Sequence, residues 1–240
     1  MGYGTEVRST VMAKKALLSA CILLAALAAW AGDVAQFVDL GFSADGRYFM
    51  FGQHGIYEKT SYPYAELYIV DVPANAFAPQ GTKKVSYAQG VEPGSTGLGA
   101  LLNALGDMAA QKRQYRIDHL VTGRLLYLLV DGVNPAETLE FRDFPAGTKY
   151  AVTLVQTAGT KDGGPAAAFS LKVTVTGRDG KAKDSTVGNA GLARAGVKAY
   201  RVKQVILGPD GAALVFVIQK EEADGQGVNI RYMVETVRLR

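Results

Sequence analysis

Cysteine and histidine are scarce in this sequence, and their scarcity limits the chemistry that the chain can perform. The 240 residues include one cysteine, Cys21, and two histidines, His54 and His119. If the chain is cleaved after Ala31, the product has no disulfide, no thiol nucleophile and no thiolate metal site. Neither histidine has a second ligand at metal-binding spacing, so we interpret both as polar residues at strand edges. We expect no metal and no cofactor.

Catalytic motifs are also missing. The nucleophile motif G-x-S-x-G is absent. Residues 94–102 (GSTGLGALL) lack a third glycine at the right spacing and the Lys-Ser/Thr pair of a phosphate-binding loop. The adjacent acids Glu221 and Glu222 fall in a predicted turn. A hydrolase with dispersed carboxylates stays open as an alternative, because catalytic acids need not be neighbours in sequence. The sequence favours a protein without catalytic activity.

Residues 1–31 have the pattern of a secretory signal peptide. Lys14 and Lys15 precede an apolar stretch, and Ala29 and Ala31 place small residues at the cleavage positions. The stretch is shorter than the roughly 20 residues that a membrane-spanning helix needs. We expect cleavage after Ala31 and a periplasmic or secreted protein, with Met12 as an alternative start.

Two other fates of this segment stay open. Residues 18–21 (LSAC) match the motif that precedes a lipidated cysteine in bacterial lipoproteins, although only five residues separate Lys15 from Cys21. The segment could instead be retained as an uncleaved membrane anchor. In both cases the protein would meet the membrane only through the leader or through a lipid at Cys21.

The charge of the chain is nearly balanced. The whole sequence has 26 basic and 22 acidic residues, a formal net charge of +4. Residues 1–31 hold three of the basic residues and one acidic residue, which leaves +2 on the remainder. A nucleic-acid-binding domain would be more basic, so we expect no nucleic-acid partner.

Residues 32–240 are predicted to form a single domain that begins and ends with similar segments. Asp45-Gly46 and Asp210-Gly211 are tight-turn signals, and both precede strands rich in aromatic and β-branched residues. An offset of 165 aligns these turns, and it also places Phe51 on Phe216. We therefore expect repeated three-stranded meanders at about 35–73 and 200–238. The strands after both turns are apolar on both faces, which predicts that they lie between two layers.

Different patterns fill the middle of the chain. Residues 95–115 place leucines at helical spacing after Ser95 and Thr96, which predicts one capped amphipathic helix. Four or five strands are expected between this helix and residue 176. Residues 177–199 are rich in Gly, Ala and Lys, and we expect a mobile, solvated loop there.

These elements indicate an all-β, mainly antiparallel domain with one amphipathic helix. The segments FSADGRYFMF and ELYIVDV resemble the blade repeat of TolB-like and WD40-like β-propellers, with LGPDGAALVF and RYMVET as a weaker second match. That resemblance implies an irregular propeller-like architecture, and a two-sheet sandwich is the alternative. The overall pattern, from the leader to RYMVETV, also resembles a bacterial family of predicted secreted proteins of unknown function, which implies no activity.

Tyrosines in the connection of the first meander give the clearest functional signal. Tyr57 and Tyr62 are predicted to bind a partner, because tyrosine rings are rigid and amphipathic. The alternative is that they only cover a loop while Tyr64 and Tyr68 pack against the sheet. We therefore expect an exported envelope protein that acts as a non-catalytic binding or scaffolding module with an envelope protein partner. An envelope hydrolase and a small-ligand sensor or carrier are the alternatives.

Overall fold

The computed structural model describes residues 32–92, 94–130, 135–225 and 227–239. The predicted signal peptide, the alternative start at Met12 and the lipidation alternative at Cys21 lie outside the described residues. From Asp33 onward the chain forms a compact unit of its own.

Antiparallel strands make up most of this unit, which confirms the predicted fold class. The strands are β1 (Gln36–Ser43), β2 (Tyr48–Ile56), β3 (Pro63–Asp71), β4 (Ala76–Ser86), β5 (Ile117–Asp118), β6 (Arg124–Leu128), β7 (Thr138–Asp143), β8 (Thr148–Lys161), β9 (Gly164–Thr176), β10 (Ala182–Ala195), β11 (Val197–Leu207), β12 (Ala213–Asp224) and β13 (Gly227–Arg238). The helices are α2 (Leu98–Asp107) and α3 (Ala109–Gln114).

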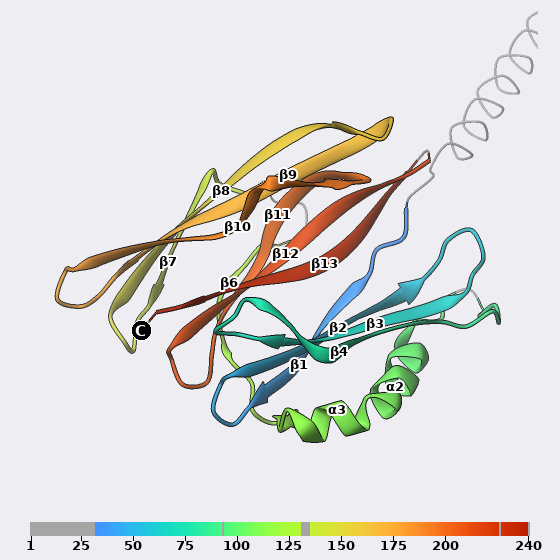
Figure 1. Cartoon of the computed structure of the whole chain (residues 1–240), viewed down its shortest axis with the longest axis horizontal. Coiled ribbons are helices and arrows are strands. Elements are labelled where there is room, and N and C mark those ends of the chain that lie inside the picture. Colours follow the sequence, from blue (N-terminus) through green and yellow to red (C-terminus); the bar gives the residue numbers. More distant parts are fainter. Residues whose placement is uncertain (1–31, 93, 131–134, 226, 240) are drawn as a thin grey trace, which may run out of the picture. The chain divides into compact units, whose positions relative to one another are not determined.

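Three sheets stack as layers, as Figure 1 shows. The helix-covered sheet has the strand order β4-β3-β2-β1-β5, the central sheet β13-β12-β11-β6, and the outer sheet β10-β9-β8-β7. One apolar core joins the outer and central sheets, a second joins the central and helix-covered sheets, and a third lies under the helices. No closed propeller is found among the described strands. The architecture is a layered sandwich of three sheets instead of two.

The alternation of apolar side chains along β12 explains why the central sheet is buried on both faces. Phe216 and Ile218 pack into the core shared with the outer sheet. Val215 and Val217 point the other way, into the core shared with the helix-covered sheet. Burying both faces removes a large apolar area from water, so β12 is fixed between two layers, as its sequence predicts.

Helices α2 and α3 replace the single helix that the leucine spacing predicts. Met108 lies between them and is buried together with Leu101 and Ala104 against the helix-covered sheet. Leu98 and Leu102 stay half exposed, so the buried stripe is narrower than expected. The N-cap residue of α2 is Gly97, which has no side chain to cap the helix. The hydroxyl of Thr96 still accepts a hydrogen bond from the Leu98 N–H, at 3.4 Å.

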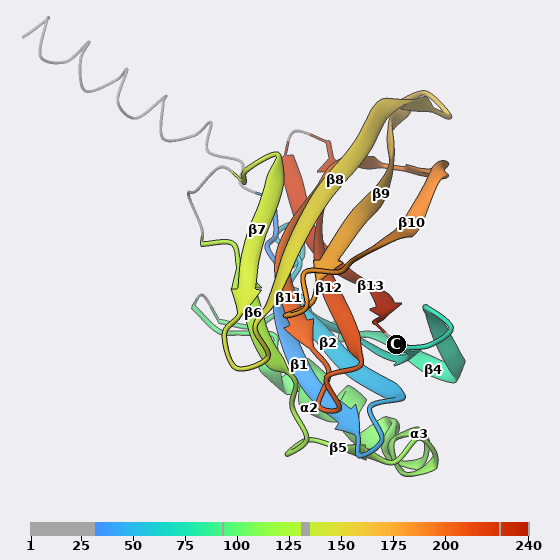
Figure 2. The ribbon, with the colours of Figure 1, turned by 90° about the vertical axis from the view of Figure 1, so that its left-hand side faces the viewer.

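Residues 182–195 form strand β10, so the mobile loop predicted across residues 177–199 is wrong. β10 pairs antiparallel with β9 over most of its length, with an irregularity between Asn189 and Arg194. Its polar, glycine-containing sequence suits the edge of a sheet, where charged residues prevent pairing with other chains. Composition alone therefore gave the wrong answer, because β9 supplies the backbone partners. Figure 2 shows β10 beside β9 at this edge.

Candidate functional site

The two tyrosines predicted to bind a partner lie on the connection between β2 and β3. Tyr57 is 37% exposed and stacks on Tyr64, with ring centroids 4.4 Å apart. The guanidinium of Arg231 lies over both rings, 4.6 Å from the centroid of Tyr64 and 6.0 Å from that of Tyr57. Tyr62 is half-buried, and its carbonyl accepts a hydrogen bond from the Tyr57 N–H at 3.0 Å. Tyr57 thus belongs to a packed cluster, and a role in partner binding stays a prediction.

The two histidines lie in different environments. His54 is 3% exposed within the central strand β2, and burial lowers its pKa, so the imidazole is neutral at pH 7. His119 is exposed after β5, with Nδ1 2.6 Å from the carbonyl oxygen of Leu40 and Nε2 3.1 Å from Lys112 Nζ. His54 therefore lies inside a sheet and not at the strand edge that its sequence context suggested. Within the described ranges, no group of three or more His, Cys, Asp or Glu side chains could hold a metal ion.

A cleft of about 300 Å³ has two carboxylates in its wall, those of Asp45 and Asp210. Asp45 accepts hydrogen bonds from Ser43 Oγ at 2.5 Å and from the Arg47 N–H at 3.1 Å, and the serine bond in particular lowers its pKa. Asp210 accepts a bond from the Ala212 N–H at 2.9 Å. Both carboxylates hold the tight turns of the two meanders, which is a structural role.

The acidic pair Glu221 and Glu222 also has a structural role. These residues lie in β12 and not in a turn. Glu221 forms an ion pair with Arg201 at 3.0 Å, and Glu222 forms one with Lys220 at 2.6 Å. Each acid is therefore neutralised within the central sheet.

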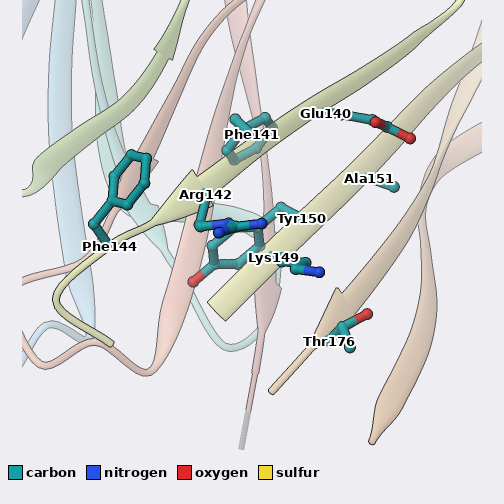
Figure 3. A pocket seen from close by; sticks show the side chains of 8 residues that line it. All are labelled: Glu140, Phe141, Arg142, Phe144, Lys149, Tyr150, Ala151 and Thr176. Atoms are coloured by element: carbon teal, nitrogen blue, oxygen red, sulfur yellow. The ribbon is translucent and has the colours of Figure 1, made fainter. Parts of the chain in front are cut away.

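A hollow of about 660 Å³ lies beside the hairpin of β7 and β8 in the outer sheet. Figure 3 shows the side chains that line it. They are Glu140, Phe141, Arg142, Phe144, Lys149, Tyr150, Ala151 and Thr176.

The alternation along β7 explains how this hollow forms. Leu139 and Phe141 face the core shared with the central sheet, so Glu140 and Arg142 project from the opposite face. Across the hairpin, Ala151 is the residue paired with Glu140, and its small side chain leaves the space open.

The turn of the hairpin, residues 144–147 (FPAG), presents an aromatic ring to solvent. The Ala146 N–H donates to Asp143 Oδ1 at 3.3 Å, and Gly147 adopts a φ of +69°, which closes the turn. Phe144 is 78% exposed at this turn. The guanidinium of Arg142 lies 5.8 Å from the centroid of its ring.

Arg142 and Lys149 are directly opposite each other in the register of β7 and β8. Among the described residues, neither has an ion-pair partner. The nearest acid on the same face of β7, Glu140, points away from the Arg142 guanidinium in Figure 3. Two like charges opposite each other on an antiparallel pair repel, and this repulsion destabilises the hairpin.

The buried acid of the same hairpin does not relieve this repulsion. Asp143 has a side chain only 1% exposed and makes a two-pronged ion pair with Arg124, with both N–O distances at 2.6 Å. The bond from Arg124 holds the pKa of Asp143 below its ordinary value. Asp143 is therefore neutralised by Arg124 and does not pair with Arg142 or Lys149, which share the outer face of the hairpin with Glu140.

This arrangement can bind an anion. Arg142 and Lys149 supply positive charge, and the Thr176 hydroxyl, on the residue paired with Lys149, supplies a further donor. Tyr150 also lines the hollow, but its ring is buried in the core beside Phe141, and this burial raises the pKa of its phenol. Sequence reasoning missed these residues. The signal available to it was the strand alternation on both sides of the turn FPAG, which fixes Arg142 opposite Lys149.

Residues 50–238 match the family described as "Predicted secreted protein (DUF2259)". The chain belongs to this family. The match begins within β2 and runs to the end of β13, so it includes the central and outer sheets, the hollow, and the helix-covered sheet except for β1 and the start of β2. It confirms the expected relationship to a family of secreted proteins, and the description names no activity. No match to a curated protein was found. No helix in the described part of the chain is long and apolar enough to cross a membrane.

Proposed function

We propose that this exported protein is a non-catalytic binding protein of the bacterial envelope, and that the hollow beside the β7–β8 hairpin binds an anionic ligand. The observation that carries the proposal is the position of Arg142 directly opposite Lys149, with no ion-pair partner for either among the described residues. A bound anion between the two side chains would replace their repulsion by two charge-assisted hydrogen bonds.

The properties of the acids favour binding over hydrolysis. The hydrolase alternative needs a carboxylic acid that is protonated near neutral pH beside a second carboxylate. Of the two acids in the cleft, Asp45 has a lowered pKa, and Asp210 is bonded to the backbone of its own turn. These two carboxylates therefore stabilise their turns, and Asp45 lacks the raised pKa that a general acid needs.

The tyrosine surface is the second candidate, and it would serve a protein partner. Replacing Tyr57 would disturb its stacking on Tyr64 and its contact with Arg231, so a loss of binding in that variant would be ambiguous. The Tyr62→Ala variant is easier to interpret, because no ring of the described residues stacks on Tyr62. Loss of a crosslinked envelope partner in that variant, at unchanged thermal stability, would support this surface.

The anion site is tested by thermal stabilisation with inorganic phosphate at constant ionic strength. A ligand that binds only the folded state raises the melting temperature. We expect phosphate to stabilise the unchanged protein, and we expect the Arg142→Ala/Lys149→Ala double variant to need about tenfold more phosphate for the same shift. The Arg113→Ala/Lys198→Ala variant is the matched control, since it removes equal charge from exposed positions elsewhere. Equal phosphate responses in all three proteins would contradict the proposal.

A further inference from the structure

A row of outward-facing side chains on β8 and β9 extends from the hollow along the outer sheet. On β8, Lys149, Ala151 and Thr153 alternate with the buried or half-buried residues that face the core. On β9, the residues paired with these three are Thr176, Thr174 and Lys172. This outward track, defined by these six residues, contains two cations and three hydroxyl groups but no acid.

The two lysines lie at opposite ends of the track. Thr176 is paired with Lys149, and Lys172 is four residues before Thr176 on β9. At roughly 3.3 Å per residue, the two positive ends are about 13 Å apart along the strands. The acids nearest the middle, Glu140 and Asp184, lie on the flanking strands β7 and β10, and Asp184 already accepts a bond from Thr174 Oγ1 at 2.6 Å. The track therefore has a lysine at each end, and the carboxylates of Glu140 and Asp184 flank its middle on the two neighbouring strands.

We infer that the ligand of this site is a linear acidic glycan that lies along β8 and β9, an inference that rests on the proposed anion-binding function. One acidic group would bind between Arg142 and Lys149, and a second acidic group would reach Lys172. The hydroxyl groups of Thr176 and Thr153, beside the two lysines, suit hydrogen bonds with the hydroxyl groups of sugar rings. Thr153 also shares a hydrogen bond with Thr138 at 2.9 Å, and Thr174, between the two ends, donates to Asp184. Phe144, at the hollow, offers an exposed apolar ring for a flat face of the first sugar.

The sheet also argues against an extended acidic peptide. Peptides that add to a sheet do so through unpaired backbone groups at an edge strand. β8 and β9 each have a neighbouring strand on both sides, so their backbone groups are already paired. Only side chains project from the track, and these suit a ligand whose own polar groups are hydroxyls and carboxylates.

The experiment is calorimetric titration of the full chain with galacturonate and with oligogalacturonates of increasing length at low ionic strength. We expect affinity to rise about tenfold once the oligomer is long enough to reach Lys172, because the second contact forms within the same complex. Lys172→Ala should remove this gain and leave the affinity for the monomer unchanged. Arg142→Ala should weaken both ligands. Lys161→Ala is the control, since it removes an exposed lysine at the far end of the same strand, β8.

The possible results separate the two proposals. Binding that does not depend on oligomer length or on Lys172, but does depend on Arg142, would overturn the glycan track and keep the anion site. Equal competition by poly-glutamate would overturn the glycan as the ligand class. Binding of the monomer that is unaffected by Arg142→Ala would overturn the anion site itself.

Discussion

The carboxyl group of Asp210 lies against Gly46, so closely that a Cβ atom at position 46 would be 3.1 Å from its Cγ. Gly46 belongs to the turn between β1 and β2, and Asp210 belongs to the turn between β11 and β12. β1 to β3 form one antiparallel meander and β11 to β13 form another, in sheets that share an apolar core. The two Asp-Gly turns therefore pack against each other at one end of this core.

Gly46→Ala should destabilise the protein more than Gly211→Ala. Both glycines adopt the left-handed conformation, with φ of +67° and +65°, so each substitution costs about 1 kcal/mol in backbone strain. Only at position 46 does the new methyl group also meet the Asp210 carboxylate, whereas a Cβ at position 211 has no atom within 4 Å. Urea denaturation measures the difference, which we expect to be about 1 kcal/mol. Equal losses would mean that the contact with Asp210 relaxes freely.

Arg231→Met should strongly lower the free energy of unfolding. The Arg231 and Asp33 side chains are 9% and 7% exposed, and they form a two-pronged ion pair that ties the start of the described chain to β13. Removing one partner leaves a buried carboxylate uncompensated, at a cost of about 3–5 kcal/mol. Lys59→Met is the control, because its ion pair with Asp224 is exposed and should contribute less than about 1 kcal/mol. Similar losses in both variants, measured by chemical denaturation, would show that burial does not strengthen the Arg231 pair.

Buried His54 should make the protein less stable in mild acid. Above about pH 6.5, the ordinary pKa of histidine, the imidazole is neutral in both the folded and the unfolded chain. Burial lowers the pKa in the folded state, so below pH 6.5 the unfolded chain binds the proton first. Stability should then fall by up to about 1.4 kcal/mol per pH unit until the pH reaches the folded-state value.

The measurement is the melting temperature between pH 7.5 and pH 5 for the unchanged protein and for His54→Gln. The variant should lose less stability on acidification. His119→Gln is the matched control, since it removes the other histidine from an exposed position. A pH profile that persists in His54→Gln would assign the acid sensitivity to other groups.

Lys149→Glu should stabilise the outer sheet while it removes anion binding. The substitution converts a like-charge pair opposite Arg142 into an attractive one, worth about 0.2–1 kcal/mol. Lys149→Gln, which only removes the repulsion, should fall between the variant and the unchanged protein in thermal melts at low salt. The gain should shrink as salt is added, because exposed charges are screened. A stability loss in both variants would indicate that Lys149 is already neutralised.

Local patterns in the sequence were enough for much of the fold. Strand alternation predicted that β2 and β12 are buried on both faces, since residues on each side of a strand report the environment of that side. The Asp-Gly pairs marked two tight turns, because few other residues adopt their backbone conformation. The prediction of a mobile loop at β10 failed because the polar composition of this segment suggests a loop. The segment forms a strand because the backbone of its neighbour, β9, pairs with it.

The candidate site depends more heavily on tertiary structure. The turn FPAG and the alternation of the strands around it are visible in the sequence, and together they predict that Arg142 lies opposite Lys149. The position of Lys172 relative to that pair depends on the register between β8 and β9. The ion pair between Asp143 and Arg124 connects β7 of the outer sheet to β6 of the central sheet. Neither relationship is present in any single segment of the chain.

The sequence by itself determined the class of fold, the sites of the tight turns and the family, because these follow from side-chain periodicity and backbone preference within short segments. The tertiary structure decided how many sheets stack, which strand lies at each edge, and which charged side chains are left without a partner. These properties depend on tertiary structure because every strand offers the same backbone donors and acceptors. Only the packing of all three layers together selects one set of neighbours, and with it the charges that face solvent.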